Sequence, residues 1–411
     1  MFKHRRIQLI TVAFTAFTDL LDFGIAIPLF GELFLASSSR FFSAGTTDGM
    51  KYFLFGLLMA SYSIAQFFMA PLLGQLSDKH GRKIILKITI FGTFFSRLLF
   101  LVAIYTQNLP LAFIARLIDG GTGGNTAVAV AAVSDLSEDK KKARNISFIY
   151  VAMALGAIAG PIISGLLHSI DLGNKFIAPF AFSALISLIN LVTINFIFNE
   201  SLKKPDLSLI IKPLSTIKDM LKVFYDHEYK NLFLSLTIFL VAYNIVSQLF
   251  PIYMVKTFDL SVATVSGLFL LLAISIVISQ AVTFNYLHKL IPARNIIKRV
   301  LPGVAICVLL LMFYHIPGIG PNVLILTLVV MVFAMLYALV LPAFSVVFTE
   351  EAGKRSHGHS LGIVSSAQAF ASSVGPLLGG FLVGIFYELP IVVCAILILL
   401  SLKLFKVWEK E

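Results

Sequence analysis

Charged side chains interrupt long apolar stretches in the first half of the chain. Asp19 and Asp22 lie three residues apart, a spacing that places both carboxylates on one face of a helix. Burial and a second nearby carboxylate both favour the protonated form of a carboxyl group. The pair therefore indicates a site that takes up and releases a proton. The other charges inside apolar stretches are Glu32, Arg97, Arg116 and Asp119.

Two other interpretations of these charges stay open at this stage. Asp19 or Asp22 can instead form a buried ion pair with Arg97 or Arg116, and Arg116 and Asp119, also three residues apart, can neutralise each other. Arginine also binds carboxylates well, so Arg97 or Arg116 can contact a neutral or anionic ligand. In every case a charge that faced lipid would be costly, so these side chains are expected to face an interior or water.

The composition indicates a membrane protein. Of 411 residues, 58% are hydrophobic and only 13% are charged, and the mean hydropathy is +0.93. These values exclude a disordered chain and a coiled coil. The two cysteines, Cys307 and Cys394, both lie in apolar runs, which argues against a disulfide framework.

Twelve apolar runs are long enough to cross a bilayer as helices. They do not alternate with the period of a strand, and a helix satisfies its own backbone groups in lipid. We therefore predict an all-α polytopic protein with twelve transmembrane helices, at 7–36, 51–75, 84–106, 109–133, 145–168, 176–198, 231–255, 261–287, 298–315, 321–348, 358–386 and 389–407.

The distribution of the positive charge predicts the topology. The net charge is +11, and nearly all of the 32 Lys and Arg residues lie at the termini or in every second connection between the predicted helices. Only Arg40, Lys51, Lys175 and Lys256 lie in the connections on the other side. The positive-inside rule then places both termini in the cytoplasm. Topology accounts for the charge, so no nucleic acid partner is expected.

The polar segment 200–230 divides the helices into two sets of six. We predict an N-terminal half at 1–199, a cytoplasmic central loop at 200–230 and a C-terminal half at 231–411. Within the loop, apolar residues at helical spacing fit either a short helix on the membrane surface or a flexible linker. Gly160-Pro161 and Gly375-Pro376 begin similar motifs in the two halves, which indicates parallel repeats.

The segment that joins the second and third predicted helices carries a specific motif. It reads Gly74-Gln75-Leu76-Ser77-Asp78-Lys79-His80-Gly81-Arg82-Lys83. This resembles the G-x-L-x-D-x-x-G-R-[RK] signature of the major facilitator superfamily, and the predicted helices and central loop extend the resemblance over the whole chain. The resemblance implies two six-helix halves that alternate access to a central cavity. It also implies a cytoplasmic gate, for which we propose Gly74, Asp78, Gly81, Arg82 and Asp135.

Further motifs resemble the drug/proton antiporters of this superfamily, the tetracycline-efflux proteins in particular. Arg116 and Gly120 match an R-x-x-x-G motif linked to proton transfer, and Asp19 stands nine residues before Pro28 as the acid of the family's first helix does. The resemblance implies proton coupling through Asp19 and Arg116, and the spacing of the neighbouring charges adds Asp22 and Asp119 to the predicted coupling residues. Gly156-x-x-x-Gly160-Pro161-x-x-x-Gly165 matches the antiporter motif of that family, and Gly375, Pro376 and Gly379 form its counterpart in the second half. We assign these glycines and prolines to helix packing and bending.

The sequence departs from the tetracycline exporters at one important place. They carry an acidic residue about where this chain has Ser96 and Arg97, and an arginine there does not suit a cationic metal–drug complex. This favours a neutral or anionic substrate. The cavity residues that we predict are Tyr62, Gln66, Arg97, Asn125, Tyr243, Asn244, Gln248, Gln280, Tyr337 and Gln368.

The sequence thus predicts a secondary active transporter rather than an enzyme, and we expect proton-coupled efflux of small molecules. The alternative is a proton-coupled importer or exporter of an anionic metabolite such as a polycarboxylate siderophore. Expected partners are a small-molecule substrate, protons and the lipid bilayer. We expect no cofactor and no metal, a monomer, and a place in a bacterial inner membrane.

Overall fold

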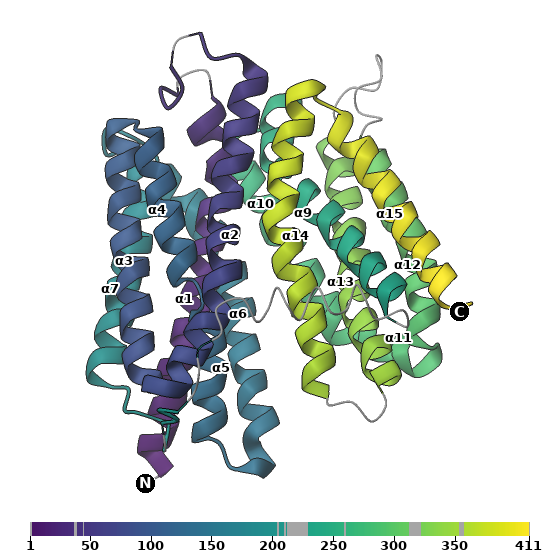
Figure 1. Ribbon diagram of the computed structural model, residues 1–411. Helices are drawn as coiled ribbons and strands as arrows, with labels where there is room; N and C mark the ends of the chain where they lie inside the picture. Colours follow the sequence, from purple (N-terminus) through teal and green to yellow (C-terminus); the bar gives the residue numbers. More distant parts are fainter. Residues whose placement is uncertain are drawn as a thin grey trace. The chain divides into compact units, whose positions relative to one another are not determined.

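The computed structural model describes residues 2–36, 39–43, 45–203, 205–208, 211, 229–258, 260–311, 322–352 and 357–410. Within these residues every regular element is a helix (Figure 1), as the apolar runs predict. The α-helices are α1 (Phe2–Leu35), α2 (Asp48–His80), α3 (Arg82–Thr106), α4 (Leu109–Thr122), α5 (Asn125–Leu136), α6 (Asp139–His168), α7 (Ile177–Phe196), α9 (Lys230–Phe258), α10 (Val262–Ile278), α11 (Asn285–Leu290), α12 (Ala293–Leu310), α13 (Val323–Ala352), α14 (His357–Ile385) and α15 (Leu389–Trp408).

Ten helical segments of the described chain are long and apolar enough to cross a membrane. The helices α4 and α5 have only 14 and 12 residues, and α12 carries Arg294, Lys298 and Arg299 in its first turns. The prediction of twelve transmembrane helices therefore stays a prediction. The short helix considered for the central loop falls on 212–228, outside the described residues.

The run at 109–133, expected as one helix, is two helices. The chain leaves helical geometry at Gly123 (ψ 12°) and Gly124 (ψ 9°), between α4 and α5. Glycine pays more entropy in a helix than other residues and packs little, so two in succession weaken the hydrogen-bond ladder. The run at 261–287 is also interrupted, by a π-helical turn at Ser279–Phe284 between α10 and α11.

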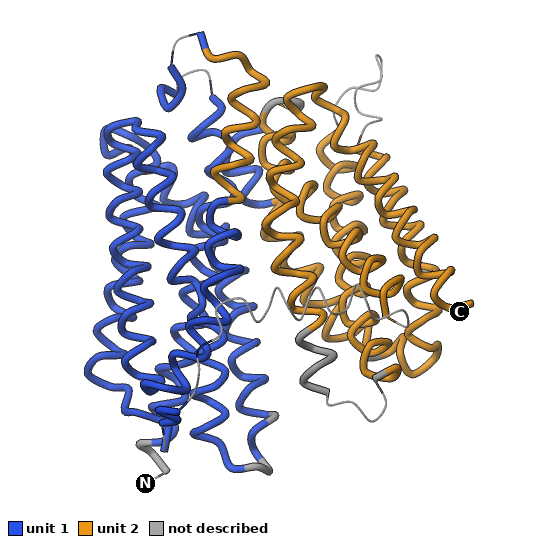
Figure 2. The backbone as a smooth tube through the Cα atoms, in the orientation of Figure 1, with its two compact units in different colours: residues 1–45, 61–215, 260–267 blue, residues 46–60, 216–259, 268–411 orange. Residues whose placement is uncertain are grey.

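The chain forms two compact units (Figure 2). Unit 1 comprises 1–45, 61–215 and 260–267, and unit 2 comprises 46–60, 216–259 and 268–411. In unit 1, α1 packs along α6 and α3 packs along α7. In unit 2, α9 packs against α14 and α15, and α12 packs against α13. The first turns of α2 belong to unit 2, where they lie against α14 at Gly56 and Gly380.

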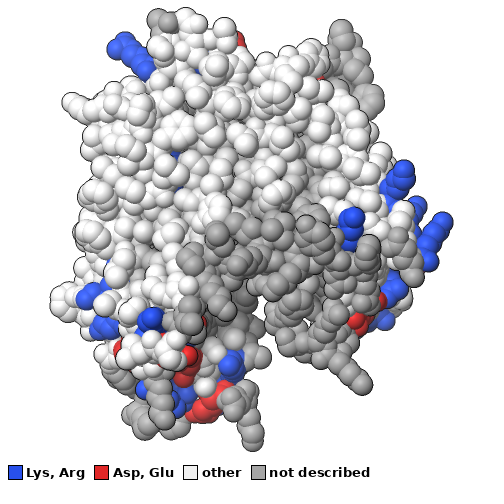
Figure 3. Space-filling model, in the orientation of Figure 1, with Lys and Arg blue, Asp and Glu red and all other residues white. Residues whose placement is uncertain are grey.

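Charge is unevenly distributed over unit 1. Figure 3 shows its Lys, Arg, Asp and Glu side chains gathered at the end where the N-terminus lies, beside a wide band almost without charge. The apolar side chains exposed on α3 show how this band is built, since Ile84, Ile88, Phe91 and Phe95 are 43–56% exposed. Apolar residues at this spacing form one outward stripe on the helix. Such a surface suits contact with lipid.

Candidate functional site

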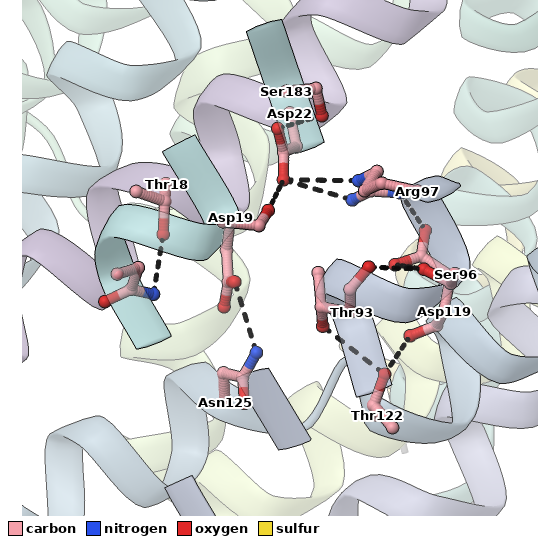
Figure 4. A network of polar contacts seen from close by, with 12 residues as sticks. Thr18, Asp19, Asp22, Thr93, Ser96, Arg97, Asp119, Thr122, Asn125 and Ser183 are labelled. Atoms are coloured by element: carbon pink, nitrogen blue, oxygen red, sulfur yellow. Dashed lines mark hydrogen bonds and ion pairs between the residues drawn. The ribbon is translucent and has the colours of Figure 1, made fainter. Parts of the chain in front are cut away.

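Asp19, in the middle of α1, lies beside the start of α5 (Figure 4). The Asn125 side chain donates from Nδ2 to Asp19 Oδ1, and the Thr126 hydroxyl donates to Oδ2, both at 3.3 Å. The described ion pairs of this region all involve the neighbouring acids and not Asp19. Asp19 is therefore held by two uncharged donors.

Asp22, one turn along α1, is instead part of an ion pair. Arg97 on α3 donates to Asp22 Oδ2 from Nη2 at 3.2 Å and from Nε at 3.4 Å. The hydroxyl of Ser183 on α7 donates to the other oxygen, Oδ1, and that of Ser187 donates to Oδ2 at 3.3 Å. The Asp22 side chain is only 2% exposed. The buried ion pair considered for the helix 1 acids is thus formed by Asp22.

Asp119 on α4 is the third carboxylate of the cluster. Its Oδ2 accepts from Arg97 Nη1 at 2.6 Å and lies 3.7 Å from Arg116 Nη1. The Ser96 hydroxyl donates to Oδ1 at 3.3 Å. The Arg116 guanidinium also stacks on the ring of Tyr62, 4.6 Å from its centroid, a favourable cation–π geometry. Arg97 therefore bridges two carboxylates, and Arg116 shares one of them.

These side chains form one charge cluster in unit 1, in which Asp22 and Asp119 are buried and the other three are half-buried: Asp19, Asp22, Arg97, Arg116 and Asp119. Three carboxylates face two guanidinium groups, so the cluster carries one negative charge when every acid is ionised. It becomes neutral when one acid binds a proton. Since Arg97 and Arg116 hold Asp22 and Asp119, Asp19 is the acid that can be protonated without breaking an ion pair.

The break between α4 and α5 is held by residues of α2. Gln66 Nε2 donates to the Gly123 carbonyl oxygen at 2.8 Å and lies 3.2 Å from Tyr62 Oη. This contact satisfies a carbonyl at the interrupted end of α4, which a buried site requires. Tyr62, Gln66 and Asn125 were predicted to line the substrate cavity. The structure places them at this break and around Asp19.

The predicted gate residues come together at one end of unit 1. Arg82 contacts Asp78 at 2.5 Å through Nη2, Asp135 at 3.0 Å through Nε, and the Ser77 hydroxyl at 2.5 Å. Gly81 has φ 104°, a conformation that favours glycine. The Glu200 carboxylate covers it, accepting from the backbone N–H groups of Arg82 and Lys83 at 2.9 and 3.0 Å. A Cβ on Gly74 would meet nothing within 4 Å, so that position is open.

The glycines of the antiporter motif lie against backbone. A Cβ on Gly156 would lie 2.3 Å from the carbonyl oxygen of Phe17, and one on Gly160 would lie 2.6 Å from the Cα of Gly24. Only glycine lets α1 and α6 approach so closely. Pro161 packs on Gly24 in the same contact, whereas Gly165 faces Ser266 of α10.

The predicted residues of the second half lie in unit 2. The rings of Tyr243 on α9 and Tyr337 on α13 are stacked with centroids 3.6 Å apart. Asn244 donates to the Leu240 carbonyl at 2.9 Å and lies against Gly375, where a Cβ would come within 2.4 Å of it. Asn244 and Gly375 therefore pack α9 against α14. The other predicted residues of this half are less tightly packed. Gly379 faces the ends of the Leu249 and Ile245 side chains, and Pro376 lies within α14 opposite Gly56. Gln248 and Gln368 are half-buried, and Gln280 is exposed.

Sequence reasoning missed several polar partners of the cluster. Ser183 and Ser187 lie four residues apart on α7, and both donate to Asp22. Their i, i+4 spacing in an apolar helix was a usable signal, because it places two hydroxyls on one face. Thr126 and Glu200 gave no such signal, since each depends on a contact between distant segments.

The geometry is that of an integral membrane protein with buried, mutually neutralising charges, and comparison with known proteins defines its class. The family model of the Major Facilitator Superfamily matches residues 12–376. The chain belongs to this family, whose members are transporters and not enzymes.

The known relatives include drug-resistance proteins. The chain is 35% identical to tetracycline resistance protein class H from Pasteurella multocida over 150 residues, 36% of each chain. It thus spans about a third of the length of the tetracycline resistance proteins that it matches. It is 24% identical over 360 residues to multidrug resistance protein 2 from Bacillus subtilis, covering 87% of this chain and 86% of that protein.

Solved structures share the fold. The human organic anion transporter MFSD10 superposes with a TM-score of 0.68 at 22% identity, covering 98% of this chain and 99% of that chain. An identity this low supports the common architecture and carries no information on substrate.

Proposed function

We propose that this transporter exports small molecules in exchange for protons and that Asp19 carries the proton. The observation that carries the proposal is the pairing within the cluster of unit 1. Arg97 and Arg116 neutralise Asp22 and Asp119, whereas Asp19 is held by Asn125 and Thr126 alone. An unpaired charge is costly to bury, so the protonation state of Asp19 affects the free energy of every conformation in which its side chain is buried.

Protonation of Asp19 changes the cluster from one net negative charge to none. The ionised carboxylate accepts two hydrogen bonds from α5, and charge strengthens such bonds. Protonation weakens these contacts and lowers the cost of burial. A proton thus binds more favourably to one conformation than to another, and this differential binding shifts the equilibrium between them.

The helix α5 connects this site to the gate. Asn125 is its first residue and Asp135 its penultimate one, so about 15 Å of helix joins the Asp19 contact to the Arg82 contact. The break at Gly123 and Gly124 separates α5 from α4. We therefore expect a shift of α5 at Asp19 to reach the Asp135–Arg82 ion pair without moving α4 by the same amount.

Export is supported by the relatives, which include tetracycline and multidrug resistance proteins by name. The alternative of an anionic metabolite gains no support from the cluster. Arg97, the side chain that suggested it, already donates to two carboxylates, and acids outnumber arginines. An added anion would increase the negative excess. A neutral or cationic substrate fits this charge better.

The test uses the full-length protein in proteoliposomes with an imposed pH gradient. The probes are tetracycline and a panel of neutral and cationic dyes, and accumulation and probe-induced proton flux are both measured. Asp19→Asn should lose proton flux and accumulation yet retain exchange of probe without a gradient, because the amide has the size of the acid and, like the protonated acid, presents one acceptor oxygen and one donor.

Glu32→Gln is the matched control, since Glu32 is an acid of the same helix that lies 3.4 Å from His168 and outside the cluster. It should transport as the unmodified protein does. Normal proton flux in Asp19→Asn would show that the proton travels elsewhere.

A further inference from the structure

The last helix of unit 2 has a buried face and an outward face. Residues of α15 that are buried recur every three or four positions, which places them on one side of the helix. This side packs against α9 and α12. They include Ile391, Cys394, Ile398, Ser401, Phe405 and Trp408.

The outward face of α15 changes character along its length. Ile396 and Leu399 are 58% and 49% exposed, which suits contact with lipid chains. From residue 403 the same face becomes basic, with Lys403, Lys406 and Lys410 all exposed. The spacing of three and four residues places the three ammonium groups side by side. Figure 3 shows Lys and Arg side chains gathered near this end of unit 2.

The three lysines line one groove of about 340 Å³ together with Leu399, Leu402 and Val407. The lining residues lie in α15 and, for Lys410, just beyond its end, so the groove is an open depression along the outward face of this helix, accessible to a polyatomic group. Among its described lining residues there is no carboxylate. The groove is therefore apolar towards the middle of the helix and cationic towards its end.

The nearest described acid on the helix does not neutralise these lysines. Glu409 accepts from Lys298 of α12 at 2.8 and 3.1 Å, on the side of α15 that packs inward. Arg294 of α12 likewise pairs with Glu351 and stacks on Trp408 at 5.1 Å. Cations on the packed side are thus paired, and within the described residues Lys403, Lys406 and Lys410 have no acidic partner.

We propose that this groove binds the headgroup of an anionic phospholipid. The three lysines would hold the phosphate and glycerol part, and Leu399 with the apolar face above it would lie along the acyl chains. A soluble anion would use the lysines but not the adjoining apolar stripe, which is why we assign a lipid. Clusters of cations at the membrane surface attract anionic lipids electrostatically.

The experiment measures binding of dioleoylphosphatidylglycerol and dioleoylphosphatidylcholine to the full-length protein in detergent, by native mass spectrometry at rising lipid concentration. Phosphatidylglycerol should bind more tightly, and salt should weaken it. The variant Lys403→Gln/Lys406→Gln/Lys410→Gln should lose on the order of a hundredfold in phosphatidylglycerol affinity, since each cation near the surface contributes to binding.

The matched control is Lys230→Gln/Lys289→Gln/Arg299→Gln, which removes three exposed cations of the same unit from other helices. It should keep the affinity. If both triple variants lose equal affinity, or if the two lipids bind alike, there is no defined site. Displacement of the lipid by millimolar glycerol 3-phosphate would show a soluble-anion site and overturn the lipid assignment. Should the triple variant fail to fold, the charge reversal Lys406→Glu gives the same comparison.

Discussion

The interiors of the two units use polar side chains in different ways. In unit 1, five charged side chains at the middle of α1, α3 and α4 neutralise one another except for one acid. In unit 2, the polar residues predicted for the cavity are uncharged, among them the stacked Tyr243 and Tyr337 and the amide Gln248. Charge in a membrane interior is costly and marks ion pathways. This difference fits the proposed function, in which unit 1 would respond to a proton and unit 2 would offer uncharged surface to a ligand.

The two units also differ in how deeply they bury the paired arginines Arg82 and Arg294. Arg82 is 7% exposed and contacts two carboxylates, Asp78 and Asp135. Arg294 contacts Glu351 but is 38% exposed. Both arginines thus pair with a carboxylate, but only Arg82 is buried. Removing a partner should therefore cost more in unit 1.

The largest effect is expected for Arg97→Met. It leaves Asp22 and Asp119 without their shared cation, and breaking a buried pair costs about 3–5 kcal/mol. The stability of Arg97→Lys should lie between that of the unmodified protein and that of Arg97→Met, because one ammonium group cannot reproduce a guanidinium that bridges two carboxylates. Thermal unfolding of the purified protein in detergent measures the loss of stability in both Arg97 variants. In unit 2, Gln248→Met should cost about 1 kcal/mol or less, because Gln248 is uncharged and only half-buried. Equal losses in the two units would contradict the contrast.

The second prediction compares two glycines of similar motifs. Gly156→Ala should cost about 1–3 kcal/mol, because its methyl group would meet the Phe17 backbone and separate α1 from α6. Gly379→Ala should be tolerated, since its nearest neighbour is the end of the Leu249 side chain at 3.3 Å. Yield of folded protein and thermal unfolding report the difference. A tolerated Gly156→Ala would show that the close approach of α1 and α6 is not required.

The third prediction compares the ion pairs of Arg82 in unit 1 and Arg294 in unit 2. Asp135→Asn should cost about 1.5–3 kcal/mol, because it weakens a charged hydrogen bond to the buried Arg82. It should also change the pH dependence of transport if α5 links Asp19 to the gate. Glu351→Gln should cost less than about 1 kcal/mol, as exposed pairs do. Thermal unfolding measures the two stability losses, and transport assays at several pH values, with both variants at equal expression, measure the effect on pH dependence. Identical pH profiles for Asp135→Asn and the unmodified protein would disconnect α5 from the proton site.

The sequence predicted what depends on local pattern. Helix class, the membrane environment and the charges that form the cluster all follow from spacing and composition, whereas the gate residues were predicted from the resemblance of the Gly74–Lys83 motif. It did not predict which acid pairs with which arginine, since Asp19 and Asp22 differ by one turn and only the positions of α3 and α5 distinguish them. The break at Gly123 was also missed, because an apolar run with glycines fits both a continuous and an interrupted helix. Thr126 and Glu200 act through contacts over long sequence separations, which periodicity does not encode.

The smallest effect is expected where charge is present without burial. Glu138 lies on the surface of unit 1 and pairs with Arg5 at 2.8 Å and with Lys141 at 2.9 Å. The hydrogen bond and charge of Lys141, together with Arg5, lower the pKa of the Glu138 carboxyl below its usual range. A lowered pKa means that the pair stabilises the folded state above the pKa of the unfolded chain and that this contribution is lost as the pH falls. Because Glu138 is exposed, water and salt screen the attraction, so Glu138→Gln should leave the unfolding temperature unchanged at neutral and at acidic pH. Measured beside Arg97→Met, this variant separates the effect of burial from the effect of charge. A large loss for Glu138→Gln would mean that charge pairing stabilises unit 1 wherever it occurs, and the buried cluster would no longer be exceptional.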